Sequence, residues 1–320
     1  MNVTVIGCGR WGSFVAWYLG RIGHQVTLYG RENSANMRRI IQEQSNGVIQ
    51  FSEEVKFETN LKKSLEADTI IISINSQGLR SLLEEIKVYS PQKKCFVLCM
   101  KGIEITTRKR LTEIVDEFFG EECEVAVWLG PGHVEDFCQG IPNCMVIDSV
   151  NKKVKERLIE EFSSKLIHFY VGTDLIGNEL GAAAKNVIGI GAGMLDGLGV
   201  SSLKGALMAR GTKEISRLIV ALGGNEYSAY GLCHLGDYEA TVFSMHSHNR
   251  QFGENIIRGQ EYTKLAEGYY TAKVLYDIAI EHNIDLPICT AIYKILYEKE
   301  KPQEVLSQLF LRPTKKEFDE

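Results

Sequence analysis

The chain has 320 residues, of which 44% are hydrophobic and 24% are charged, a balance typical of a folded globular protein rather than a disordered one. Its net charge is -5 and no extended basic stretch occurs, so the composition gives no reason to expect nucleic acid or an anionic membrane surface as a partner. The uninterrupted apolar runs are far too short for a membrane-spanning helix, and we expect no membrane insertion.

The first 33 residues predict a strand, a glycine-rich turn, a helix and a second strand. Residues 2–6 are rich in β-branched side chains, residues 13–21 suit a helix, and residues 25–29 suit a strand. Between the first strand and the helix, Gly7, Gly9 and Gly12 have the spacing GxGxxG. In this context the motif predicts a dinucleotide-binding unit, with the pyrophosphate at the helix N-terminus.

Residues at the end of the second strand distinguish NAD from NADP in dinucleotide-binding domains. An acidic residue there would bind the ribose 2′-hydroxyl, whereas an arginine would accept a 2′-phosphate. The chain has Arg31 followed by Glu32. Arg31 favours NADP, and Glu32, one position late, keeps NAD open.

Further buried strands are predicted at 68–75, 94–100, 124–129 and 144–148, with a helix near 78–88. Alternating strands and helices up to about residue 170 predict an α/β fold, a Rossmann-type doubly wound sheet. From residue 174 helical periodicity dominates. We therefore predict a dinucleotide-binding domain at 1–172 and an all-α substrate and catalytic domain at 173–320, with helices at 203–223, 225–231, 247–259, 271–283 and 287–298.

The eight cysteines lie in apolar segments and form no CxxC pair; their positions are 8, 95, 99, 123, 138, 144, 233 and 289. The chain begins with a predicted core strand and has no recognisable signal peptide. We therefore expect reduced thiols in a cytoplasmic protein.

Lys185 is the single charged residue between Glu179 and Asp196, inside a run of small and apolar residues. Desolvation favours the neutral form of such an amine, so Lys185 is a candidate acid/base catalyst near neutral pH. The alternative is a structural lysine whose stem lies on apolar surface while its ammonium reaches water.

Other polar residues follow predicted strands or lie later in the helical part. Lys101 and Gly102 follow one strand, and Gly130, Pro131 and Gly132 follow another. Residues 231–253 contain Asp237, Thr241 and the run Ser247, His248, Asn249 and Arg250. Lysines, an arginine and a helix N-terminus would suit a small phosphorylated anion, and a carboxylate would orient a buried lysine.

At these residues the chain resembles the bacterial form of the NAD(P)-dependent glycerol-3-phosphate dehydrogenases. The resemblance runs nearly end to end, through GCGRWG, CMKGIE, LGPGHVEDFCQGIP, IGNELGAAAKNVIGIGAGMLDGLG, LMARGTKEISRLIVALGGN, HLGDYEATVFSMHSHNRQFG and AEGYYTAKVL. The blocks around Lys185 and around the LGD triplet are the specific ones. The glycine motif is shared by many dehydrogenases.

The resemblance implies roles for individual residues. Lys185 matches the proton donor/acceptor, Lys101 a second lysine that contacts the substrate, and Asp237 the acidic residue of the LGD motif. The implied substrate contacts are Lys101, Gly130, Gly132, Asp237, Ser247, His248 and Asn249. The implied cofactor contacts are Gly7, Gly9, Arg10, Trp11, Gly12, Arg31, Lys101, Val134, His248 and Glu267.

The implied reaction is reversible hydride transfer between NAD(P)H and carbon 2 of dihydroxyacetone phosphate, giving sn-glycerol 3-phosphate for phospholipid synthesis. We expect no metal, because His234, His246 and His248 lack a carboxylate or thiol at a ligand spacing. The expected partner is a small phosphorylated substrate. A helical second domain often offers a surface for a homodimer.

Two positions depart from the family pattern. His248 stands where the family usually has an arginine that touches the substrate phosphate and the cofactor, and Gly132 stands where it usually has serine or threonine. Histidine is only partly protonated at neutral pH, so phosphate affinity should fall or depend on pH unless Arg250 substitutes. Asn75 and Ser76 likewise stand where proline and serine are common.

Two alternatives follow from these departures and from the shared nucleotide motif. One is a related dehydrogenase with a different keto substrate. The other is a protein that senses NAD(P) without turnover. Substrate-dependent NAD(P)H oxidation separates the sensor from the enzymes, and a panel of phosphorylated and unphosphorylated ketones separates the two enzymes.

Overall fold

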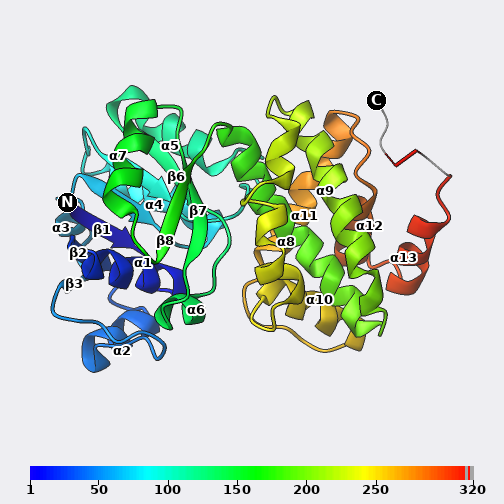
Figure 1. Ribbon diagram of the computed structural model, residues 1–320, viewed down its shortest axis with the longest axis horizontal. Coiled ribbons are helices and arrows are strands. Elements are labelled where there is room, and N and C mark those ends of the chain that lie inside the picture. The colour runs from blue at the N-terminus through cyan, green and yellow to red at the C-terminus, as the bar shows by residue number, and fades with distance from the viewer. Residues whose placement is uncertain (314–315, 318–320) are drawn as a thin grey trace.

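The computed structural model describes residues 1–313 and 316–317. Figure 1 shows a part built around a β-sheet, which carries the N-terminus, beside a part built of helices. The last strand ends at Val171 and the long helix α8 begins at Leu175. We propose that the boundary between the two domains lies between residues 172 and 173.

The described residues form one eight-stranded sheet in the order β3-β2-β1-β4-β5-β6-β7-β8. Strands β1 to β6 are parallel, β7 pairs antiparallel with β6, and β8 pairs parallel with β7. This arrangement confirms the predicted sheet fold, although β7 and β8 run antiparallel to the other six strands. The strands are β1 (Asn2–Ile6), β2 (Gln25–Tyr29), β3 (Val55–Glu58), β4 (Thr69–Ile72), β5 (Cys95–Leu98), β6 (Glu124–Leu129), β7 (Asn143–Asp148) and β8 (Ile167–Val171).

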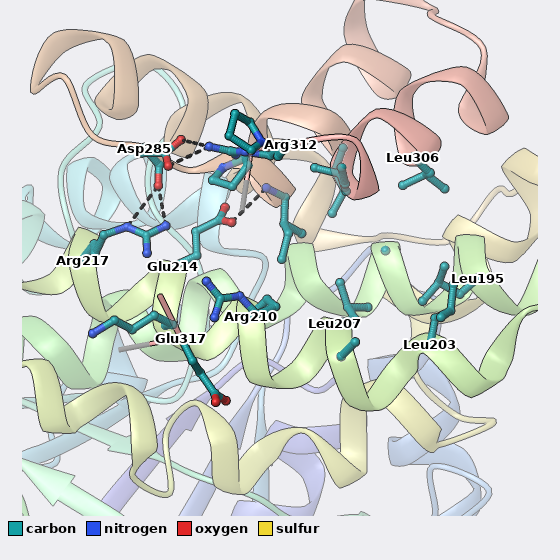
Figure 2. A pocket seen from close by; sticks show the side chains of 18 of the residues that line it. Leu195, Leu203, Leu207, Arg210, Glu214, Arg217, Asp285, Leu306, Arg312 and Glu317 are labelled. Atoms are coloured by element: carbon teal, nitrogen blue, oxygen red, sulfur yellow. Dashed lines mark hydrogen bonds and ion pairs between the residues drawn. The ribbon is translucent and has the colours of Figure 1, made fainter. Parts of the chain in front are cut away.

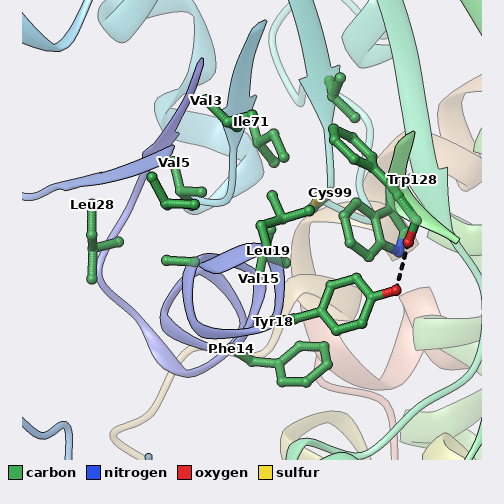
Figure 3. Packing of buried hydrophobic residues seen from close by; sticks show 14 of the residues in the cluster. Val3, Val5, Phe14, Val15, Tyr18, Leu19, Leu28, Ile71, Cys99 and Trp128 are labelled. Carbon is green, nitrogen blue, oxygen red and sulfur yellow. Dashed lines mark hydrogen bonds between the residues drawn. The ribbon is translucent and has the colours of Figure 1, made fainter. Parts of the chain in front are cut away.

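Helices cover both faces of the sheet, which is why its central strands show no polar alternation. In β4, Ile71 packs on the face covered by α1, while Ile70 and Ile72 pack on the other face with α4 and α5. Figure 3 shows Phe14, Val15, Tyr18 and Leu19 of α1 lying beneath the strands. The helices of this part are α1 (Arg10–Arg21), α2 (Ala35–Glu43), α3 (Leu61–Ser64), α4 (Leu79–Lys87), α5 (Leu111–Phe119), α6 (Val134–Cys138) and α7 (Lys152–Phe162), with 3-10 turns η1 (Ser76–Gly78) and η2 (Gly120–Glu122).

The register of the parallel strands brings their carboxyl ends to one edge. Ile6 lies beside both Tyr29 and Ile72, and Ile72 lies beside Leu98. The segments that follow these strands therefore meet at this edge, where ligands bind in open α/β sheets.

The helical part is organised around α8 (Leu175–Gly197), which packs most extensively against α10 and α11. Nearly every α8 residue from Gly177 to Leu195 is buried, which explains why its sequence is apolar on all sides. The other helices are α9 (Lys204–Ala221), α10 (His248–Arg258), α11 (Glu267–Glu281), α12 (Pro287–Tyr293) and α13 (Pro302–Phe310); the short turns are η3 (Ser201–Leu203), η4 (Glu226–Tyr230), η5 (Leu235–Asp237), η6 (Glu239–Phe243) and η7 (Lys294–Glu298).

Several predicted helices differ from the observed ones in detail. The predicted helix at 225–231 is a short 3-10 turn, η4, and the predicted helix at 287–298 ends in a π-helical turn, η7. Helix α11 begins four residues earlier than predicted, at Glu267, an acidic residue that suits a helix N-terminus. Among the residues that the structure describes, no helix is long and apolar enough to cross a bilayer.

Candidate active site

In the glycine turn after β1, the start of α1 packs closely against the backbone of the turn. Gly7 has a positive φ of 114°, and its N–H donates to the carbonyl oxygen of Tyr29 at 3.0 Å. A Cβ added to Gly12 would lie 1.9 Å from the Gly7 oxygen, so only glycine lets α1 pack against this turn.

Gly9 is the N-cap of α1, so no side chain caps the first turn, and the first turn has no acidic residue. A Cβ at Gly9 would meet nothing within 4 Å. The N–H groups of this turn therefore remain available to an anion. These residues fit a dinucleotide pyrophosphate.

The other predicted cofactor contacts of the sheet part surround this turn. The Arg10 guanidinium forms an ion pair with Glu135, in the first turn of α6. Trp11 packs between Phe14 and Phe137, at ring distances of 5.1 and 6.4 Å. The aromatic packing holds the start of α1 against α6.

Val134 is the first residue of α6 and is buried. Arg31, just beyond β2, forms a surface ion pair with Glu85 of α4, with 2.5 Å between the guanidinium and carboxylate atoms. Both partners are about half exposed. Such a pair is weak, so the Arg31 guanidinium can exchange Glu85 for another anion.

Two lysines from different parts of the fold converge on one carboxylate. Asp237, at the end of η5, lies with its Oδ2 atom 2.9 Å from the Lys185 Nζ atom and 2.6 Å from the Lys101 Nζ atom. Lys101 follows β5 and also donates to the Gly130 oxygen at 2.8 Å. Lys185 donates to the Thr241 hydroxyl at 2.5 Å. The structure thus brings together the three residues predicted to be catalytic.

Lys185 is 6% exposed, which removes the structural alternative of an ammonium that reaches water. Burial lowers the pKa of Lys185, the negative charge of Asp237 raises it and the positive charge of Lys101 lowers it, and together these effects lower the pKa to about 8. An amine with this pKa exchanges its proton near neutral pH, as acid/base catalysis requires.

A chain of side-chain amides links the lysine centre to α10 and α11. The Asn186 Nδ2 atom donates to the Lys101 carbonyl oxygen at 2.9 Å, and the Asn249 Nδ2 atom donates to the Asn186 Oδ1 atom at 3.0 Å. Asn249 in turn accepts from the Gly268 N–H at 2.9 Å. The predicted substrate residue Asn249 is therefore fixed in orientation beside the lysine centre.

Glu267, a predicted cofactor contact, bridges the two parts of the molecule. Its carboxylate accepts from the Ser76 N–H at 2.9 Å and from the Ser76 hydroxyl at 2.5 Å, and burial raises its pKa. A Cβ at Gly102 would lie 2.4 Å from the Ser76 hydroxyl oxygen. This close contact places Glu267 next to the segment that carries Lys101.

His234, three residues before Asp237, is completely buried. Its Nδ1 atom is 2.8 Å from the Gly181 oxygen and its Nε2 atom is 2.7 Å from the Tyr238 hydroxyl. The carbonyl can only accept, so Nδ1 carries the proton and Nε2 accepts from Tyr238. Because burial lowers the pKa of His234 to about 4, the ring stays neutral and ties the α8 turn before Lys185 to the residue after Asp237.

The contacts at the start of α10 show whether His248 carries a positive charge that could bind a phosphate. Ser247 caps the helix, accepting from the Arg250 N–H at 3.3 Å, and the His248 Nδ1 atom lies 2.6 Å from the Tyr262 hydroxyl. His248 is exposed, yet partial desolvation and then the charges of nearby cations lower its pKa. The imidazole is therefore mostly neutral at pH 7.

Arg250 does not compensate for His248. Its side chain is buried, and one guanidinium nitrogen lies 2.7 Å from the Asp196 Oδ2 atom and 2.9 Å from the Glu254 Oε2 atom. Of the two possibilities that the sequence left open, the structure has Arg250 facing away from His248, because these two carboxylates hold the guanidinium within the helical part.

The Phe137 ring leaves no space for a side chain at Gly132. A Cβ at this position would lie 2.3 Å from the Phe137 Cε2 atom. Phe137 is 1% exposed and stacks on Phe14 with 4.9 Å between ring centroids, so it has little room to move.

We therefore expect Gly132→Ser to lower the free energy of unfolding by about 1–3 kcal/mol. Denaturant unfolding measures the loss. Gly205→Ser is the matched control, because a Cβ there meets nothing within 4 Å. Equal stability of Gly132→Ser and the unmodified protein would show that Phe137 yields easily.

Sequence reasoning missed Asn186 and the role of His234 as a tether. Asn186 is a polar residue next to Lys185 in an apolar run, a signal that could have identified it. Arg31 lies apart from these residues, because its ion-pair partner Glu85 is part of neither the lysine centre nor the amide chain. Over residues 1–313 and 316–317, no group of three or more His, Cys, Asp or Glu side chains is arranged to hold a metal ion.

Comparisons with known proteins match the same family in both the sheet part and the helical part of the chain. Residues 2–155 match the family described as NAD-dependent glycerol-3-phosphate dehydrogenase N-terminus, and residues 174–307 match the corresponding C-terminus. Glycerol-3-phosphate dehydrogenases [NAD(P)+] of a Thermoanaerobacter strain and of Chlorobium limicola are 35% and 34% identical, each over 99% of both chains.

The fold is also similar to the crystal structure of glycerol-3-phosphate dehydrogenase from Coxiella burnetii. The TM-score is 0.91 at 28% sequence identity, and the match covers 97% of this chain and 99% of the other. Sequence and fold thus agree over both the sheet part and the helical part: the chain belongs to the family of NAD-dependent glycerol-3-phosphate dehydrogenases.

Proposed function

We propose that the chain interconverts dihydroxyacetone phosphate and sn-glycerol 3-phosphate by hydride transfer with NAD(P)H. The buried Lys185 amine, held 2.9 Å from Asp237, carries this proposal because it is the group suited to exchange a proton at the substrate oxygen. Family membership supplies the substrate and the cofactor class. The product would feed phospholipid synthesis.

The nucleotide, when bound, supplies or accepts the hydride at carbon 2 of the substrate. In the reductive direction, negative charge grows on the carbonyl oxygen as the hydride arrives. Protonated Lys185 would donate a hydrogen bond to this oxygen and then its proton. In the oxidative direction the neutral amine would accept the hydroxyl proton.

Asp237 and Lys101 would keep Lys185 in place and tune its protonation. Asp237 accepts hydrogen bonds from both amines, and Thr241 fixes a second direction around the Lys185 nitrogen. Lys101, 24% exposed, would also reach the substrate. Gly130, whose oxygen Lys101 contacts, and Asn249 would complete the substrate pocket.

The turn of Gly7, Gly9 and Gly12 would hold the pyrophosphate, and Arg31 would bind a 2′-phosphate in place of Glu85. We therefore favour NADP over NAD. Comparing the KM values for NADPH and NADH in the unmodified protein and in Arg31→Ser tests this preference: only the KM for NADPH should rise.

The direct test follows NADPH and NADH oxidation by absorbance with dihydroxyacetone phosphate as substrate. Rapid oxidation supports the proposed reaction. If protein that binds the nucleotide oxidises neither cofactor, the proposal fails. A panel of phosphorylated and unphosphorylated ketones then tests the second candidate, a dehydrogenase for a different keto substrate, which the mostly neutral His248 and the commitment of Arg250 to Asp196 favour.

His248→Arg should lower the KM for dihydroxyacetone phosphate by about tenfold, because a permanent cation adds a charge-assisted hydrogen bond to phosphate. Steady-state kinetics measures the change. Gln260→Arg, which adds the same charge at an exposed position beyond α10, is the control for general attraction. An unchanged KM would mean that another group already binds the phosphate.

We further propose a cytoplasmic location. The described chain carries eight free cysteines, six of them buried, which suits a reducing compartment. A homodimer through the helical part remains a prediction that light scattering would test.

A further inference from the structure

The helical part contains a pocket of about 720 Å³ that is separate from the candidate active site. Helices α8, α9, α12 and α13 form its walls together with Arg312, Pro313, Lys316 and Glu317 (Figure 2). None of its lining residues belongs to the sheet part, and neither Lys101, Lys185 nor Asp237 lines it. Its volume is within the range of about 300–1,000 Å³ found for small-molecule sites.

One end of this pocket is apolar. Figure 2 shows Leu195, Leu203, Leu207 and Leu306 together at this end, away from the charged groups. Leu207 and Leu306 are only partly buried, so the pocket leaves aliphatic surface in contact with water. Covering such surface is favourable by roughly 25 cal/mol per Å².

The other end is charged, and its acidic residues already have partners. Buried Glu214 accepts from the N–H groups of Ile288 and Cys289 at the start of α12. The Asp285 carboxylate accepts two hydrogen bonds from Arg312, at 2.8 and 2.9 Å. These carboxylates therefore do not neutralise the remaining cations.

Arg217 of α9 also lines this end, and its guanidinium donates to the Asp285 carbonyl oxygen. The other α9 cations of the pocket are Arg210 and Lys213. They lie three residues apart on α9, on neighbouring turns of one face. Neither forms an ion pair with any residue within the described ranges 1–313 and 316–317. Lys316 and Glu317, which also line the pocket, carry opposite charges. The pocket thus joins an aliphatic chamber to two cations, Arg210 and Lys213, whose side chains have no hydrogen-bond or ion-pair partner among the described residues.

We propose that this pocket binds a single-chain amphiphile with an anionic head. The hydrocarbon chain lies along the leucines, and the carboxylate or phosphate head contacts Arg210 and Lys213. A flexible chain needs no hydrogen bonds from the aliphatic walls, and an anionic head complements the two cations. The inference rests on this pocket alone and is independent of the proposed reaction.

Isothermal titration calorimetry of the full chain tests the proposal with decanoate, decyl phosphate and 1-decanol, each below its aggregation concentration. We expect saturable binding at one site, with at least one anion about tenfold tighter than the alcohol. The tighter anion identifies the head group. Lengthening it by one methylene should raise affinity by up to about fourfold. Absence of saturable binding by both anions overturns the proposal.

Variants separate the two ends of the pocket. The double variant Arg210→Ser/Lys213→Ser should weaken the tighter anion about tenfold and leave 1-decanol unchanged. Leu207→Trp should fill the aliphatic end of the pocket and abolish binding of both the tighter anion and 1-decanol. Ala206→Phe is a second variant that should fill the same space. Lys153→Ser, at an exposed lysine of α7, is the charge control. Undiminished anion binding by the double variant overturns the proposal, and unchanged basal enzyme activity shows that these variants are folded.

Discussion

Lys185→Met is expected to lower turnover about 10²–10⁴-fold, the range that a positioned proton donor contributes. Methionine keeps an unbranched side chain in the buried site and removes the exchangeable proton. Because Lys185 lies in α8, away from the Gly7 turn, nucleotide affinity should change little. Steady-state kinetics measures the first effect, and fluorescence titration with NADPH measures the second.

Lys204→Met is the matched control for this change. Lys204 is also buried, at 7% exposure, and its Nζ atom lies 2.7 Å from the Asp196 Oδ2 atom. Removing it breaks a comparable buried ion pair and a hydrogen bond to the Val242 carbonyl oxygen, but no hydrogen bond or ion pair of Lys185, Lys101 or Asp237. The control should lose stability while the folded fraction keeps its turnover. Similar kinetic losses in both variants would contradict the assignment of Lys185.

Asp237→Asn is expected to shift the pH dependence of catalysis to lower pH. Lys185 has a pKa of about 8, so the unmodified enzyme should lose ketone reduction as pH rises through about 8, where the amine gives up its proton. The reverse reaction needs the neutral amine and should gain over the same range. Loss of the Asp237 charge leaves Lys101 to repel the proton on Lys185, so the pKa of Lys185 falls.

Reduction by Asp237→Asn at pH 8 should fall by about fivefold or more, because a neighbouring opposite charge typically shifts a pKa by 1–3 units. Full pH profiles of kcat in both directions measure the shift. Asp196→Asn, which removes the carboxylate from the Lys204 pair, is the control and should leave the profile in place. A profile that Asp237→Asn does not move would mean that another group titrates.

The sequence alone determined those helices, strands and turns that depend on residues close together in the chain. The GxGxxG turn, the first two strands and α1 follow from short-range backbone requirements and β-branched runs, and their observed bounds agree closely with the prediction. The sequence also predicted the change from strands to helices near residue 174. Helix α8 is buried on all sides and has no polar face, so its sequence is a long apolar run with helical periodicity. The edge strand β3, half-exposed and four residues long, carried too weak a pattern to be predicted.

The sequence also identified Lys185, because one charge in a long apolar run is expensive to bury without a function or partner. Only the tertiary structure decided which groups surround that charge. Lys101 and Asp237 lie 136 residues apart and meet at 2.6 Å, and Arg250, two residues from His248, is committed to Asp196 instead of the site. Such contacts depend on helix rotation and strand register over the whole fold, so distance along the chain does not reveal them.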